Sequence, residues 1–131
     1  MFGKKAQPPI KGLLPQGCRI EGSLVFSEGM RIDGEVAGDV RGLAEQPSLL
    51  VVSDTAAIEG EIRADHVIVN GRVKGPIVAN EVLELQPRAR VEGDIQYRLL
   101  EVHAGATVCG QLKPLPAEEE KPLLKLAASN A

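Results

Sequence analysis

The chain has 131 residues, a formal net charge of −3 and only three aromatic side chains, Phe2, Phe26 and Tyr97. This length suits one domain with tails, whose core must be built from Ile, Val, Leu and Ala. The acidic balance argues against the basic face that binds nucleic acid. The sequence also shows neither a signal peptide nor an apolar run near 18 residues, so we expect a cytoplasmic protein.

Residues 1–12 are expected to form a flexible N-terminal tail that opens with MFGKK. Phe2 could insert into a bilayer while the two lysines meet anionic lipid, at roughly 1 kcal/mol per lysine. A disordered start without a role is the alternative. Many copies on one filament would hold a membrane far better than one copy, because later contacts become intramolecular. The candidate membrane-targeting residues are Met1, Phe2, Lys4 and Lys5.

Residues 13–113 repeat a pentad of the form apolar-any-Gly-any-apolar, as in Ile58-Glu59-Gly60-Glu61-Ile62. Side chains alternate between the two faces of an extended chain. The apolar residues and the glycine are therefore expected to point inward, where a missing Cβ lets the backbone bend around a narrow interior. The repeated glycines form a ladder made of Gly22, Gly38, Gly60, Gly75, Gly93 and Gly110.

The ladder spacing predicts the architecture. Its steps are 16, 22, 15, 18 and 17 residues, and the long step contains a turn-rich stretch, 41–48, that can form a surface loop. A period near 17 fits no helical repeat, but it fits one coil of a three-sided parallel β-helix. We predict an all-β fold of about six coils. The pattern leaves open whether Gly71 or Gly75 belongs to the ladder.

Stacked coils would also align the charged residues. The residue before each ladder glycine reads Glu21, Ala37, Glu59, Lys74, Glu92 and Cys109. This order places Lys74 between two glutamates, which favours stacking because opposite charges become neighbours. Pro76 cannot donate a sheet hydrogen bond and must lie at a corner or bulge.

The two cysteines, Cys18 and Cys109, occupy apolar-side or edge positions near opposite ends of the ladder. A separation of six coils forbids a disulfide within one chain, and reduced thiols are expected. After Leu112 the pattern stops. Residues 114–131, rich in proline and glutamate, predict a flexible C-terminal tail.

We expect no catalytic, cofactor or metal site and therefore no enzyme. His66 and His103 are isolated in sequence, and a Cys109–His103 pair would lack a visible third group to orient it. The chain has no Cys/His cluster typical of zinc sites, and its glycines lack the G-K-[ST] ending of a phosphate loop.

The two ends of the rod remain as the surfaces that could carry function. Neither terminal coil carries a polar cap, so unpaired strand edges and apolar side chains would be exposed. Burying each such side chain is worth about 1.5–3 kcal/mol, which favours stacking of subunits end to end. The candidate contact residues are Leu99, Leu100, Val102, Val108 and Leu112 at the C-terminal end, and Cys18, Ile20 and Leu24 at the N-terminal end.

The ordered series of pentads resembles the bactofilin family of bacterial polymer-forming cytoskeletal proteins. Residues 32–36, 58–65, 69–73 and 90–95 carry the resemblance, which covers about residues 13–113. It implies a right-handed β-helix between disordered, proline-rich tails, and filaments that form without nucleotide by pairing like ends.

The resemblance further implies roles in cell shape, in positioning client proteins such as cell-wall enzymes, or in chromosome organisation. The MFGKK start also resembles the membrane-targeting start of many family members, which implies the inner face of the cytoplasmic membrane. One departure is that the bulky aromatic residue expected near the final coil is missing, with Val108 and Leu112 there instead.

Three alternatives stay open. A left-handed hexapeptide β-helix acyltransferase would need a strict period of six, which Ile58, Ile62, Val67 and Val69 do not follow. A polysaccharide-acting β-helix enzyme would need longer coils, acid clusters on one face and usually an export signal. A non-polymerising β-helix interaction module would share the fold without assembling.

Overall fold

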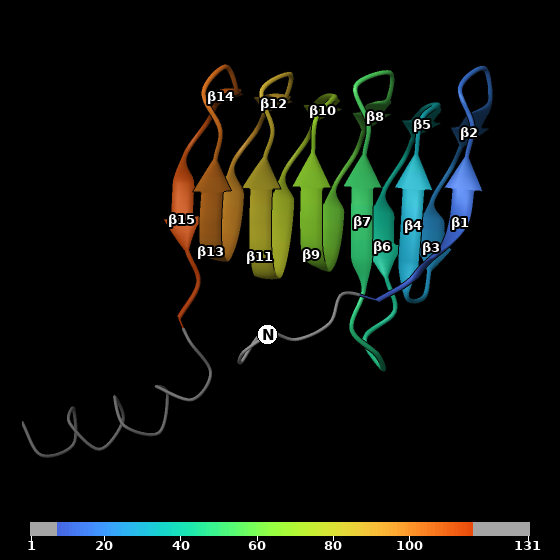
Figure 1. Cartoon of the computed structure of the whole chain (residues 1–131), viewed down its shortest axis with the longest axis horizontal. Helices are drawn as coiled ribbons and strands as arrows, with labels where there is room; N and C mark the ends of the chain where they lie inside the picture. The colour runs from blue at the N-terminus through green and yellow to red at the C-terminus, as the bar shows by residue number, and fades with distance from the viewer. Residues whose placement is uncertain (1–7, 117–131) are drawn as a thin grey trace, which may run out of the picture.

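A computed structural model describes residues 8–116, which fold into fifteen strands joined by turns and loops, with no helix among them. Each strand pairs in parallel with the strand one coil further along the chain. Figure 1 shows the result, a row of rungs that runs from the blue first coil to the orange last coil. The prediction of a parallel β-solenoid of about six turns is confirmed.

Each turn of the solenoid contributes to three faces. The first face contains β1 (Ile10–Leu14), β4 (Gly29–Ile32), β7 (Leu49–Val52) and the C-terminal parts of β9 (Ile62–Val69), β11 (Ile77–Leu85) and β13 (Ile95–Val102). The second face contains β2 (Arg19–Glu21), β5 (Glu35–Ala37), β8 (Ala57–Glu59), β10 (Arg72–Lys74), β12 (Arg90–Glu92) and β14 (Thr107–Cys109). The third face contains β3 (Leu24–Phe26), β6 (Val40–Gly42), the N-terminal parts of β9, β11 and β13, and β15 (Leu112–Pro114).

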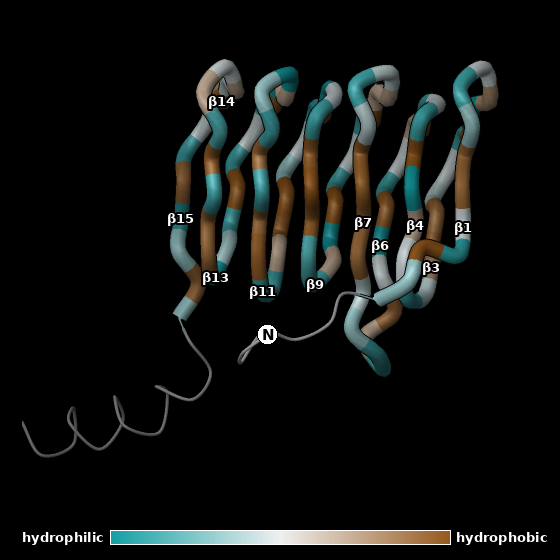
Figure 2. Tube along the Cα trace, viewed as in Figure 1, coloured by the Kyte–Doolittle hydropathy of each residue, from teal (hydrophilic) through white to brown (hydrophobic). Residues whose placement is uncertain are grey.

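The core consists of columns in which equivalent side chains stack coil on coil. On the second face the pairing places Val36, Ile58, Val73 and Val91 directly above one another, and all four are buried. Brown, hydrophobic segments accordingly recur along the faces in Figure 2. Branched aliphatic residues suit such a thin interior because they pack well on a pleated surface.

The ladder glycines lie at the corner between the second and third faces, so the prediction that they point inward is wrong. Gly60 has a φ of +153°, which side chains rarely adopt. A Cβ there would overlap the backbone carbonyl of Gly38, one coil earlier, and would therefore point along the rod. The bend takes the glycine out of the inward–outward alternation, and both its φ and the close approach of two coils require it.

A second set of corners, between the first and second faces, explains the uneven ladder steps. The turns there contain four residues, as in 53–56, or two residues, as in 33–34 and 70–71. The two-residue turns belong to the ladder steps of 16 and 15 residues, and four-residue turns belong to the steps of 18 and 17. Gly71 lies in one of these turns, whereas the N–H of Gly75 bonds the carbonyl of Glu92, so Gly75 belongs to the ladder.

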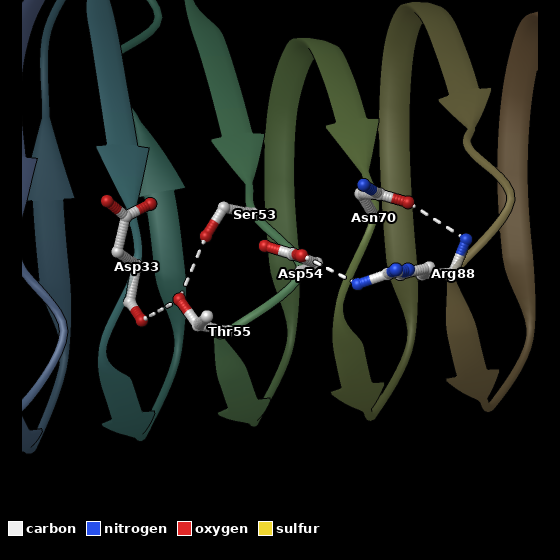
Figure 3. A network of polar contacts seen from close by, with 6 residues as sticks. All are labelled: Asp33, Ser53, Asp54, Thr55, Asn70 and Arg88. Atoms are coloured by element: carbon white, nitrogen blue, oxygen red, sulfur yellow. Dashed lines mark hydrogen bonds and ion pairs between the residues drawn. The ribbon is translucent and has the colours of Figure 1, made fainter.

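We call the four-residue turns wide and the two-residue turns narrow. Polar side chains connect them to one another (Figure 3). The Thr55 hydroxyl donates to the carbonyl of Asp33 at 2.7 Å, and a hydrogen bond from Ser53 lowers the pKa of the Asp33 carboxyl. Arg88 reaches past the narrow turn at 70–71 to bind Asp54 at 3.0 Å. A wide turn thus braces the next wide turn across a narrow one.

Three further expectations concern the middle coils. Lys74 pairs with Glu59 on one side and Glu92 on the other, as the charge ladder predicts. Pro76 lies between β10 and β11, at a corner. The long ladder step contains a loop at 43–48, between β6 and β7, which is two residues shorter than the predicted stretch 41–48 because Arg41 and Gly42 belong to β6.

Candidate functional site at the ends of the solenoid

At the C-terminal end, core columns open to solvent. Leu112 pairs with Ile95, yet Leu112 is 49% exposed and Ile95 is 0% exposed. Val102 likewise pairs with Leu85, and their exposed fractions are 53% and 0%. These side chains occupy core positions, but no further coil covers them within the part of the chain that the structure describes.

Two further residues of the predicted C-terminal surface, Leu100 and Val108, are half-buried and pack against the core. Leu100 continues the column of Leu83, and Val108 continues the column of Val91. Together with Val102 and Leu112 they form what we call the C-terminal end face.

Leu99 differs from the other predicted contact residues. It is 63% exposed, but it pairs with Val82, which is itself only half-buried. Its column runs along the corner between the third and first faces. Leu99 therefore lies at the rim of the C-terminal end face, and its exposure is not caused by the missing coil alone.

At the N-terminal end, Ile20 and Leu24 are half-buried and occupy the first rung of two core columns. The next residues in these columns, Val36 and Val40, are buried. Leu14 has the same position in a third column, below the buried Ile32, and sequence reasoning missed it. We call Leu14, Ile20 and Leu24 the N-terminal end face.

Both cysteines are free and exposed, at opposite ends of the rod. Cys18 ends the first wide turn, where its carbonyl accepts a hydrogen bond from the N–H of Glu35. Cys109 lies on the outer surface of β14, in register with the exposed Glu92. Neither thiol is part of the core, so of the two positions expected for the cysteines the apolar side is wrong. The alternative, an edge position near opposite ends of the ladder, is correct, because Cys18 directly precedes β2 and Cys109 ends β14, the two terminal strands of the second face.

The terminal strands also present open sheet edges. In the second face, β2 and β14 each pair with one neighbour among the described residues, whereas every strand between them pairs with two. Such an edge leaves backbone N–H and C=O groups free to pair with another chain. Each end of the described rod therefore combines an apolar cross-section with unpaired backbone.

The predicted membrane-targeting residues, Met1, Phe2, Lys4 and Lys5, lie outside the described residues. Within 8–116, no helix is long and apolar enough to cross a membrane.

Sequence reasoning missed a cluster near the C-terminal end. Glu84 lies one coil before Glu101 and His103 in sequence, but the ligand atoms of all three residues lie within 4.8 Å of one another. The 17-residue step between Glu84 and Glu101 matches the coil length and could have indicated that they stack. The other histidine, His66, lies on β9, one coil before Glu84 and two coils before Glu101, and burial lowers its pKa.

This geometry defines residues 8–116 as a parallel β-solenoid in which no described segment caps either end. Comparison with known sequences specifies the family. A profile of the bactofilin family, described as polymer-forming cytoskeletal, matches residues 12–113. The chain is also 32% identical over 96 residues to Bactofilin BacO of Myxococcus xanthus (strain DK1622), an alignment that covers 67% of this chain and 76% of that protein. No solved structure gives a match.

The chain therefore belongs to the bactofilin family, a family of polymer-forming cytoskeletal proteins rather than of enzymes.

Proposed function

We propose that this protein is a cytoskeletal scaffold that assembles end to end into filaments. The observation that carries the proposal is the contrast within single core columns, such as Ile95 at 0% and Leu112 at 49% exposed. A second copy stacked on this end would bury Leu112 as the next coil buries Ile95. The same contact would pair the open backbone edge of the last rung.

Filaments in which like ends meet are non-polar, and the bactofilin resemblance favours this arrangement. A contact between two C-terminal end faces would be two-fold symmetric, with the same surface on both copies. A second contact of this kind, between two N-terminal end faces, would continue the filament. The two end faces bury different residues, so each can be weakened without changing the other.

Assembly is proposed to need no nucleotide, because stacking of core columns supplies the free energy. Negative-stain microscopy of the purified chain without ATP or GTP is expected to show filaments. Adding either nucleotide should leave their number and length unchanged. Filaments that form only with nucleotide would overturn this part of the proposal, and a monomer at high concentration would overturn self-assembly itself.

The filaments are proposed to lie on the inner face of the cytoplasmic membrane, held by Met1, Phe2, Lys4 and Lys5. Each copy contributes little, but a filament contributes many copies at once. Filaments should sediment with vesicles that contain anionic lipid, and a chain with Phe2→Ala, Lys4→Glu and Lys5→Glu should stay in the supernatant. Equal sedimentation of the two proteins would show that these residues are not the anchor.

The cellular role that fits such a polymer is to organise the machinery of cell shape or of the cell wall. The filament would act by binding client proteins at the membrane and would catalyse no reaction itself.

A further inference from the structure

We propose that Glu84, Glu101 and His103 form a binding site for a divalent transition-metal ion of the zinc class. Glu84 lies on β11, and Glu101 lies in register with it on β13, one coil later. His103 follows β13 at the start of the last wide turn. The three side chains meet on the outside of the solenoid, where the last two coils stack.

The distances between the ligand atoms match those of a metal site. The Nε2 atom of His103 lies 3.1 Å from Oε2 of Glu84 and 3.3 Å from Oε2 of Glu101. Ligand atoms that surround zinc tetrahedrally at about 2.0–2.1 Å are about 3.3–3.4 Å apart. The two carboxylates lie within 4.8 Å of each other, so an ion would need only a side-chain adjustment between them.

Hydrogen bonding alone satisfies this arrangement poorly. One ring nitrogen of His103 faces two carboxylate oxygens, and a neutral ring carries at most one proton on that nitrogen, which it cannot direct well at both. If that nitrogen carries no proton, three acceptor atoms face one another. A cation at their centre would interact favourably with all three.

The stacking of Glu84 and Glu101 also favours a bound cation. Like charges directly opposite in a sheet are destabilising, and the second face avoids them by placing Lys74 between Glu59 and Glu92. Glu84 and Glu101 both lie within ion-pair distance of His103, whose ring is charged only when protonated. A bound dication would neutralise both carboxylates.

The donor set selects the class of ion. Imidazole nitrogen suits zinc and its neighbours in the first transition series better than it suits calcium or magnesium. Three protein ligands leave a coordination position open to solvent or to a further ligand. Gln86 donates to Oε2 of Glu84 at 3.3 Å and helps to fix the orientation of that carboxylate.

The site lies beside the C-terminal end face, because Glu101 and His103 belong to the last coil. Without an ion, two such ends would bring together two pairs of acidic side chains. An ion that binds the assembled end more tightly than the free end would favour assembly by mass action. This second step rests on the proposed end-to-end function, whereas the metal site itself does not.

The test is isothermal titration calorimetry with Zn²⁺ on the full chain, made without a histidine tag. Cys18→Ser and Cys109→Ser are introduced throughout, because both exposed thiols would bind zinc themselves. We expect one zinc ion per chain. His103→Gln and Glu84→Gln should each weaken binding at least about tenfold, whereas Glu81→Gln, on the same strand but outside the cluster, should bind as the parent does.

Circular dichroism checks that each variant is folded. A parent chain that binds no zinc, or a His103→Gln variant that binds as tightly as the parent, would overturn the metal site even if filaments form. Filament length with Zn²⁺ or with a chelator then tests the link to assembly. Longer filaments with zinc, lost in His103→Gln, would support the link. Equal lengths in a chain that binds zinc would overturn the link and leave the site intact.

Discussion

Single glycines allow neighbouring coils to approach closely at one corner of the rod. At the corner between the second and third faces, each ladder glycine lies against the carbonyl of the glycine one coil earlier. Gly22 is different because it belongs to the first coil, and a Cβ there would meet nothing within 4 Å. Gly22 and Gly60 share a positive φ but differ in this contact, so together they separate backbone strain from steric overlap.

Gly60→Ala is therefore expected to destabilise the protein by about 1–3 kcal/mol more than Gly22→Ala, since only Gly60 meets a neighbouring coil. Both variants carry the strain of a positive φ, so this contribution cancels in the difference between their free energies of unfolding. Chemical denaturation followed by circular dichroism measures the difference. Equal stabilities of the two variants would mean that close packing at this corner is unimportant.

The glycine residues also show what sequence can predict at this scale. Their spacing predicted the coil and the number of coils, because each corner needs one residue that tolerates both the bend and the contact. Their direction was predicted wrongly, because simple alternation holds along a straight strand and fails at a corner. Gly71 and Gly75 looked equivalent in sequence, and only the hydrogen bonds of Gly75 distinguish them.

At the scale of the strand, register decides which charges meet. The exposed column on the second face places Lys74 of β10 between Glu59 of β8 and Glu92 of β12. All three side chains are exposed, so their mutual energy is modest and depends on salt. Their order nevertheless places a positive charge between two negative charges across three coils.

Lys74→Glu would place three glutamates in one column and should destabilise the protein by about 0.5–2 kcal/mol at low salt, since each of two pairs contributes about 0.2–1 kcal/mol. The neutral Lys74→Gln should cost less. The difference between the free energies of unfolding of the two variants should be smaller in high salt, as measured by denaturation at two ionic strengths. A gap that does not respond to salt would contradict an electrostatic origin.

Sequence reasoning succeeded for elements that repeat and failed for those that do not. The alignment of Lys74 with its neighbours follows from the repeat alone. The contact of Arg88 with Asp54, 34 residues apart, does not, because it spans two coils and passes over a two-residue turn. Leu99 was misjudged and the Glu84–Glu101–His103 cluster was missed because each depends on how a turn joins its strand.

At the scale of the whole molecule, residues 8–116 form a rod whose inner coils are each covered by neighbouring coils and whose two ends have no cap within that range. Inner coils bury their apolar columns on both sides, whereas the two end faces bury them on one side only. A solenoid of this kind is completed by a cap or by another copy. Membership of a polymer-forming family favours another copy.

A matched pair of substitutions separates folding from assembly, because Ile95 and Leu112 occupy the same column. A charge at Ile95, which is fully buried, should unfold the rod, since an unpaired buried charge is costly. A charge at Leu112 can reach water in a single chain and should leave the rod folded. Circular dichroism distinguishes the two outcomes.

The size of Leu112→Asp in solution, measured by sedimentation, tests the central claim most directly. Stacking would bury the new carboxylate, so filaments are expected to disappear and folded particles to remain. If like ends pair, these particles should contain two chains joined through their N-terminal end faces, whereas head-to-tail stacking would leave single chains. Filaments as long as those of the parent chain would contradict assembly through the exposed core columns.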